Sequence, residues 1–441
     1  MRLTRDTAAL PVTSVHLGLG AFHRAHQAWY THRAGGSGIA AFTGRRPDAA
    51  IPLAAQDGLY TLLERGADAD RPEIIGSISA AHDGADLDAL RTYLADPAVT
   101  VVTTTITEAG YHRDRAGDID QGDPVIAHDI ADIGAAQSAP GRLLAGLIAR
   151  RDADSGPIAV VPCDNLAANG PTFERVMISL AEAVDPELPS WMRDNVSFVS
   201  TMVDRITPAT TDADRSAAAK LTGFTDAAPV VAEPFSEWIL TDAFPAARPA
   251  WESAGARLVK DVTPHEDRKL LLLNGSHSLL AYAAPTRGHR TVAEAIADDT
   301  CRSWVEEWWD EAVTQLDFPA AELTNYRKAL IERYSNPRIQ HNLSQIAADG
   351  SQKLPIRVVP VLRAGRAAGR IPSGAVRPVA GWLVHLRAGQ VKDPRAAELV
   401  PAVQGDLEVA VRVVLDAIAP ELISDDEVRA AIQAEAEQLG A

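Results

Sequence analysis

Cysteine and long apolar runs are both scarce in this chain of 441 residues. Its two cysteines, Cys163 and Cys301, are far apart in the sequence, so we expect neither a disulfide framework nor a conventional Cys/His zinc centre. No apolar run approaches the ~20 residues that a membrane-spanning helix needs. The opening segment, Met1 to Asp6, has no secretory apolar region and leads straight toward an expected strand. We therefore expect a cytoplasmic protein without a membrane partner.

Positively charged residues are also fewer than negatively charged ones. The chain has 42 Lys and Arg against 59 Asp and Glu, which gives a formal net charge of -17. A balance this acidic argues against nucleic acid or an anionic membrane surface as a partner. The hydrophobic fraction of 46% and the charged fraction of 23% are ordinary for a globular protein. The length predicts two or three domains, each with room for a hydrophobic core.

Strand and helix patterns alternate up to about residue 260. Short apolar or β-branched runs predict strands over 12–19, 38–43, 58–64, 73–79, 99–107 and 157–162, and a helix is expected over 143–151. This alternation predicts a Rossmann-like, doubly wound parallel sheet with helices on both faces. Amphipathic patterns then predict helices over 291–316, 320–334, 406–418 and 425–439. We expect an α/β dinucleotide-binding domain over 1–258 and a mainly helical catalytic and substrate domain over 259–441.

Two glycines, Gly18 and Gly20, directly follow the first expected strand and precede a helical stretch. In the dinucleotide fingerprint, the first glycine allows a tight turn and the second lets backbone N–H groups approach a pyrophosphate at the helix N-terminus. His23 stands where the third glycine would be, so the motif alone is weak. The alternative is a strand–helix turn that happens to hold glycines.

An acidic residue after the second strand normally binds the ribose hydroxyls in NAD-specific sites. Asp48 is the nearest candidate, and we favour NAD over NADP. Arg45 and Arg46 lie beside it and could instead hold a 2′-phosphate.

The segment from Glu266 to His277 is apolar except for groups that can hold or move protons. Leu270 to Leu273 leave no polar side, and at about 100° per residue Glu266, Lys269, Asn274 and His277 fall within an arc of roughly 140°. Burying an ammonium group costs several kcal/mol, roughly, unless it is paired or loses its proton. Lys269 is therefore a candidate for a lowered pKa and for general-base chemistry. The alternative is a core helix with a snorkelling lysine and a hydrogen-bonded core histidine.

Several segments, in order between residues 15 and 360, together resemble the mannitol dehydrogenase family of polyol-specific long-chain dehydrogenases. They are Val15–Gln27, Thr105–Tyr111, Cys163–Gly170, Met202–Pro208, Glu233–Trp238 and the Lys269 segment. The resemblance implies an oxidoreductase acting on CH–OH groups with NAD and without a metal ion. It also implies cofactor contacts from two of these segments. The cofactor residues are Gly18, Gly20, Phe22, His23, Arg24, Thr107 and Glu108, with Asp48 added from its position after the second strand.

The resemblance further implies the roles of the catalytic residues. Lys269 takes the hydroxyl proton during oxidation and returns it during reduction, while Asn165 and Asn274 polarise the carbonyl. His277 places the substrate oxygen, and Glu266 passes protons between the lysine and solvent. The remaining residue of this polar cluster is Asp204. Without the resemblance, Asn165 could be a turn residue after a strand, and Asp204 could pair with the adjacent Arg205.

The substrate stretch leans toward one branch of this family, the fructuronate reductases, or D-mannonate oxidoreductases. Asp349–Pro355 looks like their version, and Gln345 stands where mannitol-type enzymes tend to carry an arginine. A sugar acid needs a cation or a fork of donors for its carboxylate. Lys353 is the first candidate and Arg357 a weaker one. The alternatives are a mannitol- or arabinitol-type polyol 2-dehydrogenase and a catalytically silent dinucleotide-binding sensor.

Overall fold

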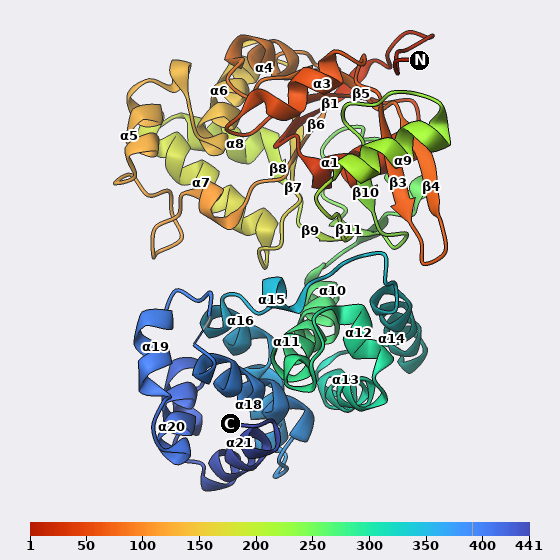
Figure 1. Ribbon diagram of the computed structural model, residues 1–441. Helices are drawn as coiled ribbons and strands as arrows, with labels where there is room; N and C mark the ends of the chain where they lie inside the picture. Colours follow the sequence, from red (N-terminus) through yellow and green to blue (C-terminus); the bar gives the residue numbers. More distant parts are fainter. Residues whose placement is uncertain (390) are drawn as a thin grey trace. The chain divides into compact units, whose positions relative to one another are not determined.

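The computed structural model describes residues 1–389 and 391–441, which divide into two compact units, Met1–Thr263 and Pro264–Ala441. Figure 1 shows strands in the first unit and helices throughout the second. The strands of the first unit are β1 (Val12–Leu17), β2 (Gly38–Phe42), β3 (Tyr60–Arg65), β4 (Asp70–Ile75), β5 (Ile78–His82), β6 (Val101–Thr104), β7 (Ile158–Pro162), β8 (Val196–Phe198), β9 (Thr201–Asp204), β10 (Val230–Ala232), β11 (Glu237–Thr241) and β12 (Arg257–Val259). Its helices and 3-10 turns are α1 (Ala21–Ala25), α2 (Gln27–Ala34), η1 (Pro47–Ala49), α3 (Ala50–Ala54), α4 (Leu87–Leu94), η2 (Glu108–Tyr111), α5 (Pro124–Ala131), η3 (Ile133–Ala135), α6 (Ala139–Asp152), α7 (Asn169–Val184), α8 (Leu188–Asn195), α9 (Asp212–Thr222) and η4 (Trp251–Ala254).

The central sheet of the first unit is six-stranded, with the order β5-β2-β1-β6-β7-β8 and parallel pairing throughout. This is the Rossmann order, in which the chain reverses direction across the sheet between the first and fourth strands. Here the reversal, or switch point, lies between β1 and β6. The expected doubly wound α/β fold is confirmed. Two three-stranded sheets, β10-β3-β4 and β12-β11-β9, lie beside it in the chain's first unit.

Alternating side chains explain why helices cover both faces of this sheet. Val102 and Val160 belong to one core, together with leucines of α4, α6 and α7. Their neighbours Val101 and Val161 belong to another core, which includes Tyr30 of α2. Successive residues of a strand point to opposite faces, so a strand that is apolar at every position needs cover on both sides.

One strand expected from the sequence is two strands in the structure. Instead of a single strand over 73–79, β4 pairs antiparallel with β3, and β5 joins the edge of the central sheet next to β2. The chain changes sheets at Gly76 and Ser77, and the Ser77 hydroxyl donates to the carbonyl of Ala28 at 2.6 Å. Period-2 alternation continues through both strands, so the sequence pattern did not mark the break.

The second unit is helical, as expected. Its elements are α10 (Thr263–Arg268), η5 (Lys269–Asn274), α11 (Gly275–Ala283), η6 (Ala284–Arg287), α12 (Val292–Ala297), α13 (Asp299–Ala312), η7 (Val313–Gln315), α14 (Ala320–Tyr334), α15 (Leu343–Ile346), α16 (Gly350–Arg357), α17 (Val359–Ala367), α18 (Ser373–Arg387), α19 (Ala396–Ala402), α20 (Leu407–Ile418), η8 (Pro420–Leu422) and α21 (Asp426–Gln438). Every residue of α11 is buried, and its apolar side chains share one core with α13 and α18. The helix expected over 291–316 is broken at Asp298, whose side chain caps α13.

Within the described ranges 1–389 and 391–441, no helix combines the length and the apolar character that crossing a membrane would require.

Candidate active site

The turn after β1 is locked between two strands. Gly18 has a φ of 106°, and a Cβ built on it would lie 2.4 Å from the carbonyl oxygen of Thr105. The Thr105 hydroxyl donates to the Gly18 carbonyl at 2.8 Å, and the amides of Gly18 and Leu19 donate to the Phe42 carbonyl at 2.9 and 2.8 Å. Only glycine fits both the backbone conformation and the space. The first glycine of the motif therefore has the role that the fingerprint requires.

Gly20 differs from Gly18 in its surroundings. It is the N-cap of α1, and a Cβ on it would meet only the Gly18 carbonyl, at 3.5 Å. The space beside it is open, which is where a second glycine lets a pyrophosphate approach the backbone. The residues present therefore fit a dinucleotide.

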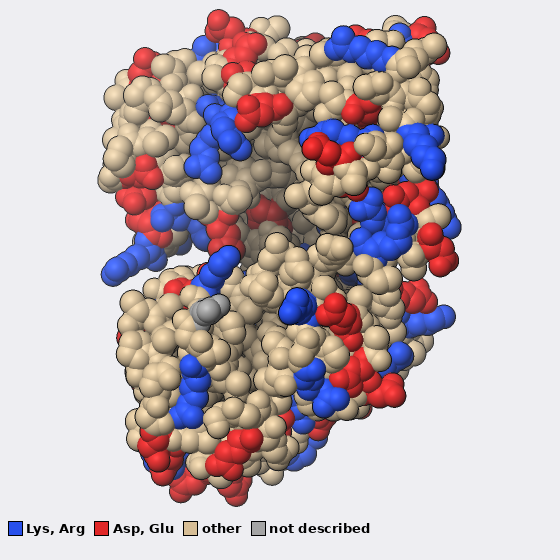
Figure 2. Space-filling view, viewed as in Figure 1, with Lys and Arg blue, Asp and Glu red and all other residues tan. Residues whose placement is uncertain are grey.

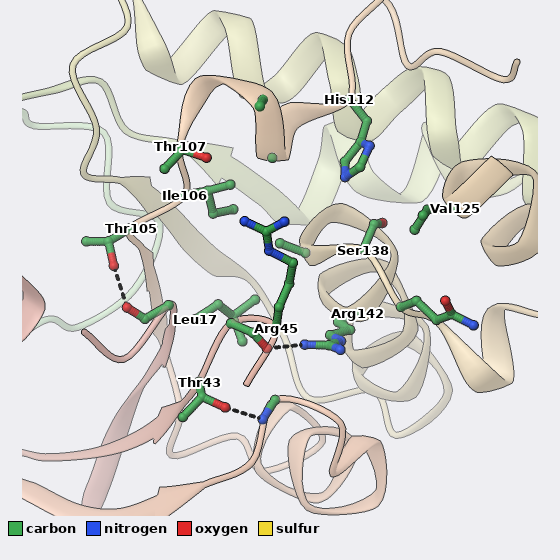
Figure 3. A pocket seen from close by; sticks show the side chains of 17 residues that line it. Leu17, Thr43, Arg45, Thr105, Ile106, Thr107, His112, Val125, Ser138 and Arg142 are labelled. Carbon is green, nitrogen blue, oxygen red and sulfur yellow. Dashed lines mark hydrogen bonds between the residues drawn. The ribbon is translucent and has the colours of Figure 1, made fainter. Parts of the chain in front are cut away.

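A cavity of about 550 Å³ opens beside this turn, and Figure 3 shows the side chains that line it. Its walls come from the ends of β1, β2 and β6 and from the start of α6, and they include Gly18, Arg45, Thr107 and Arg142. The cavity lies where the parallel strands end, at the switch point. Open α/β sheets bind their ligands in this place.

The structure places the other expected cofactor residues in different surroundings. Thr107 lines the cavity, and Glu108 lines a shallower hollow beyond it. Phe22 stacks on His26 with ring centroids 5.1 Å apart.

The His23 ring is fully buried and stacks on the His16 ring, with ring centroids 3.3 Å apart. The Arg24 guanidinium donates to the carbonyls of Gly20 and Ala228. The side chains of His23 and Arg24 thus support the glycine turn from behind.

Asp48 does not belong to the cavity wall, although the sequence singled it out for the ribose. It lies on η1 with its side chain 71% exposed and pairs with Arg46 at 3.3 Å. Arg45 lines the cavity instead, and Figure 3 shows its side chain reaching toward Ile106. The signal for this was present in the sequence, because Arg45 is closer than Asp48 to the end of β2.

Asn165 and Asp204 also belong to the first unit. Asn165 is exposed on the loop that follows β7, and the loop is held by the side chain of Asn169. Asn169 donates to the carbonyl of Thr201 at 2.9 Å and accepts from the amide of Thr201, also at 2.9 Å. Sequence reasoning gave Asn169 no role, and only its place within the Cys163–Gly170 segment pointed to it. Asp204 ends β9 and is buried.

The pairing of Asp204 with Arg205 was the alternative role for that carboxylate. The Arg205 guanidinium donates to the carbonyls of Ala25 and Glu233 and lies 3.5 Å from a Glu64 carboxylate oxygen. Arg205 therefore ties β9 to α1 and to the loop after β10.

In the second unit, the Lys269 segment departs from the expected α-helix. Lys269–Asn274 forms a π-helical turn, in which the Gly275 amide donates to the carbonyl of Leu270, five residues earlier. In an α-helix, residues five apart point in directions about 140° apart. A π-turn bonds residues i and i+5, so their side chains lie nearer to one face than they would in an α-helix. The turn thereby brings Lys269 and Asn274 closer to one face than the sequence pattern predicted.

Side-chain donors from neighbouring helices hold the carbonyls of this turn. The indole N–H groups of Trp308 and Trp309 donate to the carbonyls of Leu271 and Leu272, each at 2.9 Å. The Tyr334 hydroxyl donates to the Leu273 carbonyl at 3.2 Å. Because these bonds come from fixed, buried rings, they stabilise a backbone shape that is rare in proteins.

Gly275 makes this arrangement possible. A Cβ on Gly275 would lie 2.4 Å from a ring carbon of Trp308. The glycine therefore lets the Trp308 indole approach the helix closely enough to reach the Leu271 carbonyl.

His277 follows on α11 and is buried among aromatic rings. Its ring lies 4.8 Å from that of His341 and 4.9 Å from that of Tyr334. Burial lowers the pKa of His277 well below its usual value, and the nearby His341, Arg333 and Arg357 lower it further. The imidazole is therefore neutral at physiological pH, and its Nε2 has no hydrogen-bond partner among the described residues.

Lys353 and Arg357 lie one helical turn apart on α16. The Lys353 ammonium donates to the carbonyl of Ala348 at 2.7 Å and lies 3.9 Å from Asp349. Arg357 Nη1 lies 3.4 Å from the Ser278 hydroxyl, and its buried Nε has no hydrogen-bond partner among the described residues. Burial lowers the pKa of Lys353, and the neighbouring Arg357 lowers it further. Gln345 is exposed on α15.

One cluster in the second unit has the ligand types of a metal site. Potential ligand atoms of His289, Asp298 and Cys301 all lie within 4.8 Å of one another. However, the Asp298 Oδ2 already accepts from Arg287 at 2.7 Å and lies 2.9 Å from His289 Nε2. A guanidinium beside the carboxylate opposes a bound cation, and we read the cluster as an ion pair at the start of α13.

Comparisons with known proteins agree on one family. A model described as the mannitol dehydrogenase Rossmann domain matches residues 12–253, and one described as the mannitol dehydrogenase C-terminal domain matches residues 261–439. The chain is 38% identical to the uncharacterised oxidoreductase YeiQ of Escherichia coli (strain K12), covering 91% of this chain and 86% of YeiQ. It is 37% identical to the D-mannonate oxidoreductase of the same strain, covering 89% and 85%.

A solved structure extends these matches to the whole fold. The ternary complex of Pseudomonas fluorescens mannitol 2-dehydrogenase with NAD and D-mannitol superposes with a TM-score of 0.81. The two sequences are 35% identical, and the match covers 98% of this chain and 92% of the other.

Proposed function

Because this chain belongs to the mannitol dehydrogenase family, we propose that it is an NAD(H)-dependent oxidoreductase that acts on the CH–OH group of a sugar acid without a metal ion. The specific reaction we propose is the interconversion of fructuronate and mannonate. Two matches support this choice of chemistry: the D-mannonate oxidoreductase and the NAD complex of mannitol 2-dehydrogenase. The observation that carries the choice of an acid is the uncompensated cation on α16, described below.

The nicotinamide supplies or accepts the hydride when the dinucleotide is bound. The residues that would hold the dinucleotide are Gly18 and Gly20 of the glycine turn and Thr107, of which Gly18 and Thr107 line the cavity. The remaining chemistry is the movement of one proton to or from the substrate oxygen. Side chains of this chain must perform it.

We assign that proton transfer to Lys269. As a ketone is reduced, its oxygen gains negative charge and needs a proton, and the lysine ammonium can deliver one. The Asn274 amide, brought toward the same face by the π-turn, can donate a hydrogen bond to the same oxygen. An amide stabilises the developing charge without adding a formal charge that would disturb the lysine. Glu266, one helical turn before Lys269, is the proposed route by which protons exchange with solvent.

His277, Asn165 and Asp204 complete the proposed catalytic set. A neutral imidazole can accept a hydrogen bond at one ring nitrogen and donate at the other, which suits the positioning of a hydroxyl group. The lowered pKa of His277 keeps it in this form. Asn165 is a second proposed amide donor to the carbonyl, and Asp204 a proposed polar group of the same set.

The guanidinium of Arg357 favours an acidic substrate. No carboxylate among the described residues pairs with its guanidinium, whereas Asp349 lies 3.9 Å from the ammonium of the neighbouring Lys353. Arg357 is half-buried, and a partly buried cation without a counter-ion is unfavourable. A substrate carboxylate would supply the missing charge through two parallel hydrogen bonds. A neutral polyol would leave Arg357 uncompensated. Gln345 is retained as a proposed substrate contact.

The first experiment follows NADH absorbance with fructuronate, mannonate, mannitol and arabinitol. We expect turnover with the two acids and much less with the two polyols. In Lys269→Ala, turnover should fall by several orders of magnitude while NADH affinity stays close to normal, because the lysine moves a proton and does not hold the nucleotide. Activity in the variant equal to that of the parent would overturn the base assignment.

A second experiment tests the carboxylate contact with Arg357→Met and Lys353→Met. Both should raise KM for the acid substrate far more than KM for a neutral polyol. Arg302→Met is the matched control, since Arg302 is exposed on α13. An equal effect of Arg357→Met on both substrate classes would remove the carboxylate role and favour a mannitol- or arabinitol-type enzyme. NADH binding without turnover on any substrate would favour a silent sensor.

A further inference from the structure

We propose that Arg45 gives the nucleotide cavity affinity for a 2′-phosphate, so that the chain binds NADP(H) as well as NAD(H). This inference rests on the proposed function, because it takes the cavity beside Gly18 as the cofactor site. It concerns the adenosine end of the cofactor and leaves the redox chemistry unchanged.

The first observation is the residue that the second strand delivers to the cavity. In NAD-specific Rossmann sites, an acid near the end of this strand accepts hydrogen bonds from the ribose hydroxyls. In this chain Thr43, Gly44 and Arg45 follow β2, and all three line the cavity. The acid further along, Asp48, points its carboxylate at Arg46 on an exposed turn.

The second observation is the charge of the cavity as a whole. Arg45 and Arg142 both line it, and no aspartate or glutamate is among its lining residues in the described part of the chain. Arg142 Nη1 donates to the carbonyl of Gly44 at 2.8 Å, which fixes the backbone directly before Arg45 (Figure 3). Burial lowers the pKa of Arg142, and the carboxylates of Asp83 and Asp129 offset part of this effect.

The Asp83 and Asp129 carboxylates are engaged elsewhere. Asp83 Oδ1 accepts from the amide of Ala85 at 3.0 Å. Asp129 accepts from the amides of Gln137 and Ser138, at 2.7 and 3.0 Å. Neither residue lines the cavity, so neither replaces the missing ribose acceptor.

The chemistry of the two ribose groups separates the cofactors. A ribose with free hydroxyls gains most from a carboxylate acceptor, which this cavity does not present. A 2′-phosphate is an anion with several acceptor oxygens, and a guanidinium is the side chain best shaped to bind it with two hydrogen bonds. Arg45 is exposed, so it can turn toward the phosphate without first breaking a buried bond.

The test measures binding of two nucleotide fragments to the full-length protein by isothermal titration calorimetry. One fragment is 5′-AMP and the other is 2′,5′-ADP, which differs only by the 2′-phosphate. We expect the parent protein to bind 2′,5′-ADP on the order of tenfold more tightly. Arg45→Gln should reduce this ratio to about one while leaving 5′-AMP affinity unchanged. Arg46→Gln is the matched control, because Arg46 pairs with Asp48 outside the cavity, and it should keep the parent ratio.

Two outcomes would overturn the inference: equal affinities for the two fragments in the parent protein, or an equal loss of both in Arg45→Gln. If the parent protein binds 2′,5′-ADP and 5′-AMP equally tightly while NADH-dependent turnover persists, only the inference on Arg45 fails. If neither fragment nor NADH binds, the cavity is not the cofactor site, and the proposed function falls with it.

Discussion

At the scale of single residues, two buried imidazoles, those of His16 and His23, support the glycine turn. His16 lies 2.8 Å from the Thr103 hydroxyl through Nδ1 and 3.1 Å from the Thr105 hydroxyl through Nε2, and its ring stacks on His23. Burial lowers the pKa of His16 to about 3 and that of His23 well below its usual value. Both rings are therefore neutral in the folded protein, and the third glycine of the common fingerprint is replaced by this stack.

These pKa shifts predict how stability depends on pH. Above pH 6.5, His16 is neutral in both the folded and the unfolded chain and contributes nothing to the pH dependence. Between pH 6.5 and about 3, the unfolded chain binds a proton at His16 that the folded chain does not, so stability falls as pH falls. His16→Asn should reduce the slope of unfolding free energy against pH in this window by up to about 1.4 kcal/mol per pH unit. Denaturant titrations from pH 7 to pH 4 would measure it, and an unchanged slope would contradict the assignment.

The two glycines of the turn should respond differently to alanine. In Gly18→Ala the new Cβ would meet the Thr105 carbonyl at 2.4 Å in a left-handed backbone conformation. We expect unfolding free energy to fall by about 2 kcal/mol or more. In Gly20→Ala the Cβ meets only the Gly18 carbonyl, at 3.5 Å, so stability should change little while dinucleotide affinity drops. Chemical denaturation together with NADH titration would separate these effects, and the same response from both variants would contradict them.

At the scale of elements, sequence patterns predicted some parts well and others not at all. The helix expected over 320–334 matches α14, because it has a helical period and follows Pro319. The strand expected over 38–43 nearly matches β2, because it is a short apolar run that begins at a glycine. The π-turn could not be predicted, since Leu270–Leu273 are apolar at every position and suit either helix type. What selects the turn is the pair of tryptophans on α13, about 35 residues later in the sequence.

The role of the indole donors in the π-turn can be tested by substitution of Trp308. Trp308→Phe removes the indole donor and leaves the carbonyl of Leu271 without that partner, while the phenyl ring still fills most of the space of the indole. We expect a loss of about 1–3 kcal/mol in stability and a fall in kcat larger than the change in NADH affinity, because the backbone beside Lys269 loses a support. Trp304→Phe on the same helix is the control, since Trp304 packs only at the edge of the core. Equal kcat in the two variants would argue against the role of the turn.

The whole molecule divides between Thr263 and Pro264, whereas the sequence suggested a boundary between residues 258 and 259. The candidate residues are shared between the units: the glycine turn, Asn165 and Asp204 belong to the first, and Lys269, Asn274 and His277 to the second. The sequence selected Lys269, Asn274 and His277 by type and spacing, and Asn165 and Asp204 by their resemblance to the family's segments. It could not show that the second strand presents Arg45 to the cavity and Asp48 to solvent, because that depends on how the chain turns at Pro47.

The rarity of cysteine also has a measurable consequence for the molecule as a whole. Cys163 and Cys301 are free and buried, one in each unit. Burial raises the pKa of Cys163 well above its usual value and that of Cys301 to about 11. Because the thiolate is the reactive form, we expect no rapid reaction of the native protein with a thiol reagent such as DTNB. Two thiols should titrate in guanidinium chloride, and reductant should leave the melting temperature unchanged. A fast-reacting thiol in the native state would contradict this account.

The π-turn makes the Lys269 segment sensitive to the number of its residues, although its apolar residues can be exchanged for one another. The i→i+5 bonds of a π-turn accommodate one residue more than α-helical bonds do. A further leucine inserted between Lys269 and Asn274 would find no such accommodation, and every residue downstream would rotate by about 100° around the axis. His277 would then leave its place between His341 and Tyr334, although no polar residue had been changed. Natural variation in this stretch should therefore consist of exchanges among apolar residues, with further insertions eliminated by selection.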